Sequence, residues 1–111
     1  MRKLFVAVLI TAASAVLATQ ALAATRSVKV GDDYFVRKGS TPTVTVKKGT
    51  TVVWRFRGND LHNIAVTKGP VKFHSPYKDS GTFSKKMRRA GRYTIVCTIH
   101  SGMKMKLRVT R

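Results

Sequence analysis

The chain has 111 residues, with 22 Lys and Arg against only four acidic residues, and a formal net charge of +18. Such a length accommodates one small domain and little more. The single cysteine, Cys97, excludes an internal disulfide, which is the usual support of a small exported domain.

The first 23 residues have the pattern of a secretory signal peptide. A basic start precedes an apolar run over 4–18, and residues 21–23 read Ala-Leu-Ala, an arrangement suited to signal peptidase. An uncleaved anchor is the alternative, because 4–24 has about the length of a membrane span, but several polar side chains dilute that run. We therefore predict a signal peptide over 1–23 and an exported domain over 24–111, periplasmic or extracellular.

The expected mature chain is strongly basic. It has 20 Lys and Arg against four Asp, a net charge of +16, and no Glu. A field of this sign attracts an acidic protein or an anionic cell-envelope surface and speeds the encounter. The densest basic cluster, Lys85-Lys86 with Arg88-Arg89, is more simply a solvated strand and turn than a dedicated docking site.

Apolar and polar residues alternate along most of the expected mature chain, which is the period of two that predicts β-strands with one buried face. Turn signals separate the runs, and we find no sustained helical period. In chain order the predicted strands are 28–30, 34–36, 44–46, 52–56, 62–66, 83–87, 93–97 and 105–109. Seven or eight short strands at this spacing favour an all-β fold, an antiparallel β-sandwich or barrel.

Residues with metal-ligating side chains follow one of these strands. The strand phase turns Cys97 inward, and taken alone a buried thiol usually acts as a small hydrophobic residue. His62, however, also lies in an inward phase at a strand end, and His100 with a nearby methionine follows Cys97. Two imidazoles, a thiolate and a weak thioether are the donors of a blue-copper site. Zinc fits less well because it rarely accepts a thioether.

Residues 27–110 resemble the plastocyanin, amicyanin and pseudoazurin branch of the cupredoxins. The resemblance is carried by the segment 93–103 (YTIVCTIHSGM), the strand pair 44–54 (VTVKKGTTVVW) and the sequence Asp60-Leu61-His62-Asn63. It implies a Greek-key β-sandwich that binds one type 1 copper ion. It also implies that His62, Cys97 and His100 are the equatorial ligands.

The axial ligand has two candidates. Amicyanin-like spacing from His100 selects Met103, whereas pseudoazurin-like spacing selects Met105. We favour Met103, because Met105 is in phase with the core residues of the last predicted strand. The resemblance further implies that Asn63 ties the two ligand loops together by hydrogen bonds.

Three other interpretations concern residues in or near the predicted site. Many relatives have a proline in the ligand loop, and its absence here affects the rigidity and potential of the site. His74 has no partner at ligand spacing and is interpreted as a surface or loop residue. The resemblance also implies that His100 is the edge by which electrons leave, with Ile99, Gly102 and Met103 as the apolar rim around it.

The favoured function is one-electron transfer, with copper cycling between Cu(II) and Cu(I) and the basic surface steering an acidic redox partner. The sequence offers no general base, nucleophile pair or open substrate position, so we do not expect an enzyme. One alternative is non-redox copper storage or delivery. Another is a metal-free sandwich held to anionic polymers by charge alone, whose binding would be sensitive to salt. We expect a monomer without a nucleic-acid partner and without a membrane span after signal cleavage.

Overall fold

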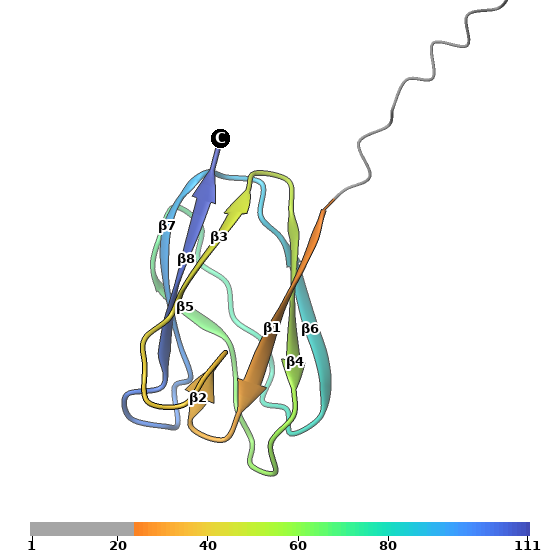
Figure 1. Cartoon of the computed structure of the whole chain (residues 1–111), viewed down its shortest axis with the longest axis vertical. Coiled ribbons are helices and arrows are strands. Elements are labelled where there is room, and N and C mark those ends of the chain that lie inside the picture. The colour runs from red at the N-terminus through yellow and green to blue at the C-terminus, as the bar shows by residue number, and fades with distance from the viewer. Residues whose placement is uncertain (1–23) are drawn as a thin grey trace, which may run out of the picture.

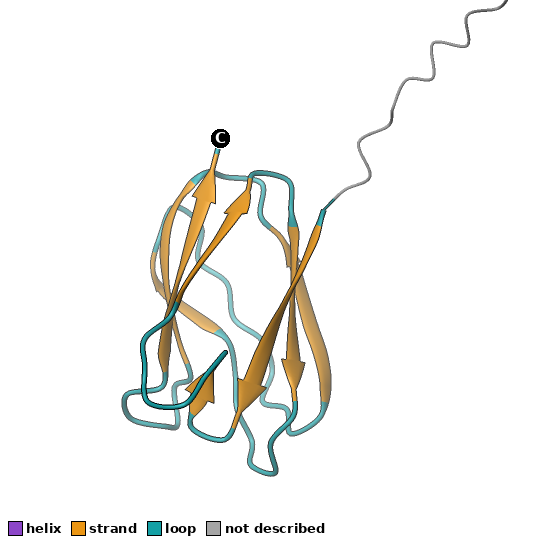
Figure 2. Ribbon diagram, in the orientation of Figure 1, coloured by secondary structure: helices purple, strands orange, loops and turns teal. Residues whose placement is uncertain are grey.

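The computed structural model describes residues 24–111, which form eight β-strands joined by loops (Figure 2). The predicted signal peptide, residues 1–23, lies outside the described residues, so that expectation is untested. Among residues 24–111, no helix is long and apolar enough to cross a membrane.

The strands form two four-stranded sheets packed face to face (Figure 1). One sheet has the order β2-β1-β4-β6 and the other β3-β8-β7-β5. The strands are β1 Thr25–Gly31, β2 Tyr34–Phe35, β3 Thr43–Lys47, β4 Thr51–Phe56, β5 Ala65–Lys68, β6 Gly81–Lys86, β7 Gly91–Val96 and β8 Lys104–Thr110. The predicted β-sandwich is confirmed.

Both sheets are mixed, however, and not purely antiparallel. Strand β1 runs parallel to β4, and β3 runs parallel to β8, whereas the remaining pairs are antiparallel. The cause is that the chain changes sheet between β2 and β3 and again between β3 and β4, so strands distant in sequence become neighbours. Alternating hydrophobicity identifies a strand's buried face but carries no information on the direction of its neighbour.

The core lies between the two sheets and follows the predicted alternation. Val52, Trp54 and Phe56 of β4 are at most 4% exposed, and they belong to the same core cluster as Met105 and Leu107 of β8, which are fully buried. Trp54 donates its indole N–H to the Met105 sulfur at 3.5 Å, so this buried polar group has a partner. Each such large apolar side chain contributes roughly 1.5–3 kcal/mol through burial.

Three connections lie together at one end of the sandwich, at the bottom of Figure 1: β1–β2, β4–β5 and β7–β8. Among the strand boundaries that differ from the prediction, the start of β5 bears most on this end of the fold: β5 begins at Ala65 and not at His62. His62 instead forms an isolated bridge with Lys78, in which each backbone N–H donates to the other residue's carbonyl at 2.9 Å. This pair of bonds fixes the His62 backbone at the edge of the fold.

Candidate metal centre

Three metal-ligating side chains converge at this end of the sandwich. His62 comes from the β4–β5 connection, and Cys97 and His100 come from the β7–β8 connection. The two Nδ1 atoms are 3.1 Å apart, and Cys97 Sγ lies 3.9 Å from His62 Nδ1 and 3.4 Å from His100 Nδ1. The structure therefore brings together the three predicted equatorial residues.

The β7–β8 connection is closed by its own backbone. Cys97 N donates to the Met103 carbonyl at 3.0 Å, and Met103 N donates to the His100 carbonyl at 3.3 Å. Gly102 has a φ of 78°, a left-handed conformation that glycine adopts without the cost paid by other residues. The short loop between Cys97 and β8 therefore has a defined shape that holds the thiol and the imidazole near each other.

Asn63 joins the two connections that carry the ligands. It is 5% exposed, and its Oδ1 accepts hydrogen bonds from Thr98 N at 2.8 Å and from Thr98 Oγ1 at 3.1 Å. The predicted tie between the ligand loops is thereby confirmed. Because Asn63 follows His62 and Thr98 follows Cys97, these bonds fix the separation of the imidazole and the thiol.

Two carboxylates that no sequence pattern assigned to the site face the outer nitrogens of the histidines. Asp32 Oδ1 lies 3.0 Å from His62 Nε2, and Asp33 Oδ1 lies 3.5 Å from His100 Nε2. Both come from the β1–β2 turn. The sequence signal at this point, Gly31-Asp32, indicated only a turn.

Asp32 is held in its ionised form. The hydrogen bond from His62, together with those from the backbone N–H groups of Asn59 and Asp60, lowers the pKa of Asp32 from 3.8 to about 2. Hydrogen bonds to a carboxylate favour its charged form. The site therefore includes a fixed negative charge on the side of His62 that faces away from Cys97.

The two histidines differ in their access to solvent. The side chain of His62 is 1% exposed, whereas that of His100 is 24% exposed. Ile99 beside His100 is half exposed, but Met103 is 1% exposed. The expectation that Met103 forms part of the apolar rim around His100 is therefore wrong, because its side chain is buried.

The donor set suits a cation. A His62 Nε2–H that donates to Asp32 leaves Nδ1 of the same ring as a bare acceptor, and this atom faces His100 Nδ1 and the Cys97 sulfur. A point equidistant from these three atoms lies about 2 Å from each, close to the 2.0–2.3 Å of metal bonds to imidazole and thiolate. The residues present therefore fit a metal ion.

The two methionines occupy different places. Met105 is fully buried within β8, and its sulfur accepts the Trp54 indole N–H, so it takes part in the core. Met103 precedes β8 and bonds through its backbone to both Cys97 and His100. Only Met103 belongs to the loop that carries two of the converging donors.

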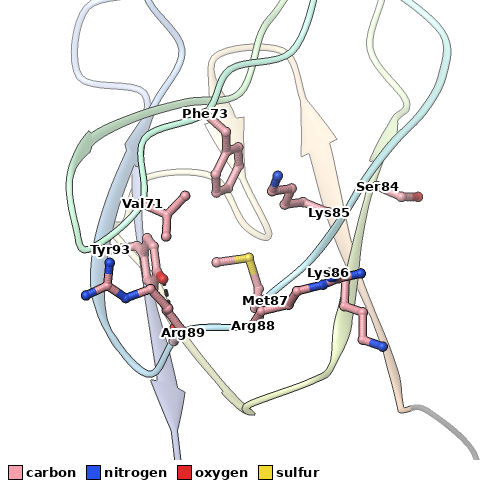
Figure 3. A pocket seen from close by; sticks show the side chains of 9 residues that line it. All are labelled: Val71, Phe73, Ser84, Lys85, Lys86, Met87, Arg88, Arg89 and Tyr93. Atoms are coloured by element: carbon pink, nitrogen blue, oxygen red, sulfur yellow. Dashed lines mark hydrogen bonds between the residues drawn. The ribbon is translucent and has the colours of Figure 1, made fainter.

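The remaining predicted features lie elsewhere. His74 is exposed and forms an isolated bridge with Ala65, outside the group of His62, Cys97 and His100. The basic cluster 85–89 borders a separate open hollow of about 490 Å³, shown in Figure 3. The apolar part of that hollow consists of Val71, Phe73, Met87 and Tyr93.

Residues 25–110 match the family described as copper binding proteins of the plastocyanin/azurin family. The chain belongs to this copper-binding family. It is a cupredoxin, as the sequence resemblance implied, and copper, as one type 1 ion per chain, is its cofactor. The family assignment and the donor geometry thus agree on the metal.

Solved structures agree with the family. A reduced Cu(I) form of an amicyanin mutant has 26% sequence identity and a TM-score of 0.65, over 82% of this chain and 87% of that one. Another Cu(I) amicyanin mutant has 26% identity and a TM-score of 0.66 over the same shares. A copper-containing nitrite reductase from Thermus scotoductus SA-01 has 23% identity and a TM-score of 0.65, over 78% of this chain but only 22% of the reductase. A search of curated proteins gives no match.

Proposed function

We propose that this cupredoxin is an exported one-electron carrier whose copper is bound by His62, Cys97, His100 and Met103. The observation that carries the proposal is the convergence of two Nδ1 atoms and one Sγ within 3.9 Å of one another. Met103 is the axial candidate because Met105 is engaged with Trp54 in the core. Copper supplies the Cu(II)/Cu(I) couple, and a weak axial thioether is typical of electron-transfer sites.

The protein's part in this function is to hold its donors still. Asn63 joins the two ligand connections, the Cys97–Met103 and Met103–His100 bonds close the loop, and the Lys78 bridge fixes His62. These contacts do not involve the metal. A frame of this kind keeps one geometry for both oxidation states, which lowers the rearrangement that accompanies electron transfer.

His100 is the proposed electron edge. Its imidazole is the ligand candidate that reaches solvent, with 24% of its side chain exposed against 1% for His62. Ile99 provides an apolar neighbour on the surface. A partner that docks over this end of the sandwich approaches the copper through one ring.

The partner would be an acidic redox protein, steered by the net charge of +16 that follows removal of the signal peptide. The immediate surroundings of His100 differ in sign, because Asp33 and Asp60 lie beside it. The basic field would therefore act over long range, whereas the contact at His100 is apolar and locally acidic. An anionic cell-envelope surface remains a second use of the same basic field.

A role as an enzyme is not proposed. The type 1 donor set would leave no position open for a substrate, and the chain spans about a fifth of the nitrite reductase chain that it matches in fold. Storage or delivery of copper is the alternative use of the same ligands.

One pair of measurements on the copper-loaded domain 24–111 distinguishes electron transfer from copper storage or delivery. An electron carrier gives a reversible one-electron voltammetric wave and retains its copper during incubation with a competing chelator. A storage or delivery protein transfers the ion to the chelator and exchanges electrons slowly. A chain that releases copper readily and shows no reversible wave contradicts the proposal.

A further inference from the structure

The β1–β2 turn places a carboxylate directly against the buried ligand candidate. Asp32 Oδ1 is 3.0 Å from His62 Nε2, on the side of the ring opposite the Nδ1 atom that faces Cys97. His62 is 1% exposed, so water has little access to compete for that nitrogen. Asp32 is therefore the main hydrogen-bond partner of His62 Nε2.

The position of Asp32 is built into the fold. Asn59 N donates to both carboxylate oxygens at 3.0 Å, and Asp60 N donates to Oδ1 at 3.1 Å. These bonds join the β1–β2 turn to the connection that carries His62. Together with His62 Nε2, these two backbone N–H groups give the carboxylate three donors and a defined orientation.

Gly58 provides the space that this carboxylate occupies. A Cβ at residue 58 would lie 1.9 Å from Asp32 Oδ1 and 2.6 Å from its Cγ. Gly58 is not among the glycines with a φ in the left-handed region, so its backbone conformation is open to other residues. The need for glycine here comes from the approach of Asp32.

Asp33 offers a natural comparison. It is the next residue and has the same charge, and its Oδ1 faces the outer nitrogen of the other histidine. The separation is 3.5 Å, however, and its side chain is 67% exposed against 35% for Asp32. Solvent screens an exposed pair strongly, so its effect on the ring is small.

We propose that Asp32 is a positioning residue that fixes His62 with Nε2–H outward and Nδ1 toward the copper, and that lowers the reduction potential of the site. Partners of a ligating histidine's second nitrogen set its tautomer and raise its basicity. A more basic ligand beside a fixed negative charge stabilises Cu(II) relative to Cu(I), and this lowers the potential. The inference rests on the proposed function, since it takes His62 as a copper ligand.

The test compares D32N with D33N in the copper-loaded domain, because both variants remove one negative charge from the same turn without changing side-chain size. In D32N we expect the Cu(II)/Cu(I) equilibrium to shift at least tenfold toward Cu(I), a rise in potential of about 59 mV. In D33N we expect less than about a threefold shift. Equal shifts in the two variants overturn the proposal, because Asp32 would then act only as a generic charge.

The variant G58A separates position from charge. It leaves the number of charges unchanged and displaces the Asp32 carboxylate, so we expect a rise in potential in the same direction as in D32N. The folding of G58A is checked by circular dichroism.

A second experiment follows the His62 Nε2–H proton by NMR in the diamagnetic Cu(I) protein. We expect this proton to exchange slowly with water in the wild type and faster in D32A, where no acceptor remains. A proton that exchanges equally slowly in D32A overturns the positioning role even where G58A fails to fold.

A failure of the proposed function would look different. If the wild-type domain forms no blue copper site, the proposed copper ligation itself is refuted. If the wild-type domain is blue but D32N leaves its reduction potential unchanged, only the role of Asp32 is refuted.

Discussion

Asn63 connects the two loops that carry the site, and its removal should destabilise the protein even without copper. In Asn63→Ala, the Thr98 N–H and hydroxyl lose an acceptor that lies at 2.8 and 3.1 Å. Each hydrogen bond contributes about 0.5–1.5 kcal/mol, so the pair amounts to roughly 2 kcal/mol. For a domain of this size that loss lowers Tm by roughly 8–16 °C.

The assay is urea unfolding of the copper-free domain, followed by circular dichroism, because bound metal would add its own stabilisation. Thr98→Val removes only the hydroxyl donor and should cost about half as much. It also removes the 3.0 Å contact between Thr98 Oγ1 and the Tyr77 hydroxyl, so Tyr77→Phe serves as its control. Asn63→Ala that unfolds within about 0.5 kcal/mol of the wild type refutes the structural role of the tie.

The remaining predictions concern the axial ligand, a buried phenol and the core. Met103→Leu should keep one copper per chain but raise the potential, whereas Met105→Leu should leave the visible spectrum unchanged; the reverse pattern assigns the axial position to Met105. Burial raises the pKa of Tyr93 above its ordinary 10.0. The contribution of the neutral phenol to stability is therefore complete below pH 10 and is lost as the pH rises through the raised pKa. Unfolding and tyrosinate absorbance should increase together in that pH range. Tyr93→Phe, which also loses the 2.8 Å bond to the Arg89 carbonyl, should abolish this pH dependence. Leu107→Ala, at a fully buried position of β8, should cost about 2–5 kcal/mol in urea unfolding, and a loss below about 1 kcal/mol contradicts the placement of the core.

Sequence patterns identified the parts of this site that depend on local spacing. The alternation of apolar residues placed Trp54 and Leu107 in the core, and the spacing of Cys97 and His100 marked the ligand loop. His62 was found because its inward phase, at a strand end, matched the donors missing from that loop. These signals lie within short stretches of chain, where strand geometry dictates which side chains share a face.

Contacts between distant connections could not be read in the same way. Asp32 and Asp33 had the pattern of a turn, and their relation to His62 and His100 depends on how the β1–β2 turn packs against loops more than 25 residues away. Gly58 likewise indicated only the end of a strand, whereas its role in the structure is to leave space for the Asp32 carboxylate. The parallel pairing of β1 with β4 also arises from the path of the chain between sheets.

The copper assignment is tested most sharply by the visible absorption spectrum of the domain 24–111 during titration with Cu(II), measured beside that of Cys97→Ser. We predict an intense blue band from thiolate-to-copper charge transfer that saturates at one copper per chain and is absent in the variant. The variant His74→Ala, which changes the histidine outside the site, should keep the band. A wild-type domain without that band, and with Cys97 still titrating as a free thiol, contradicts the assignment of these residues as a type 1 copper site.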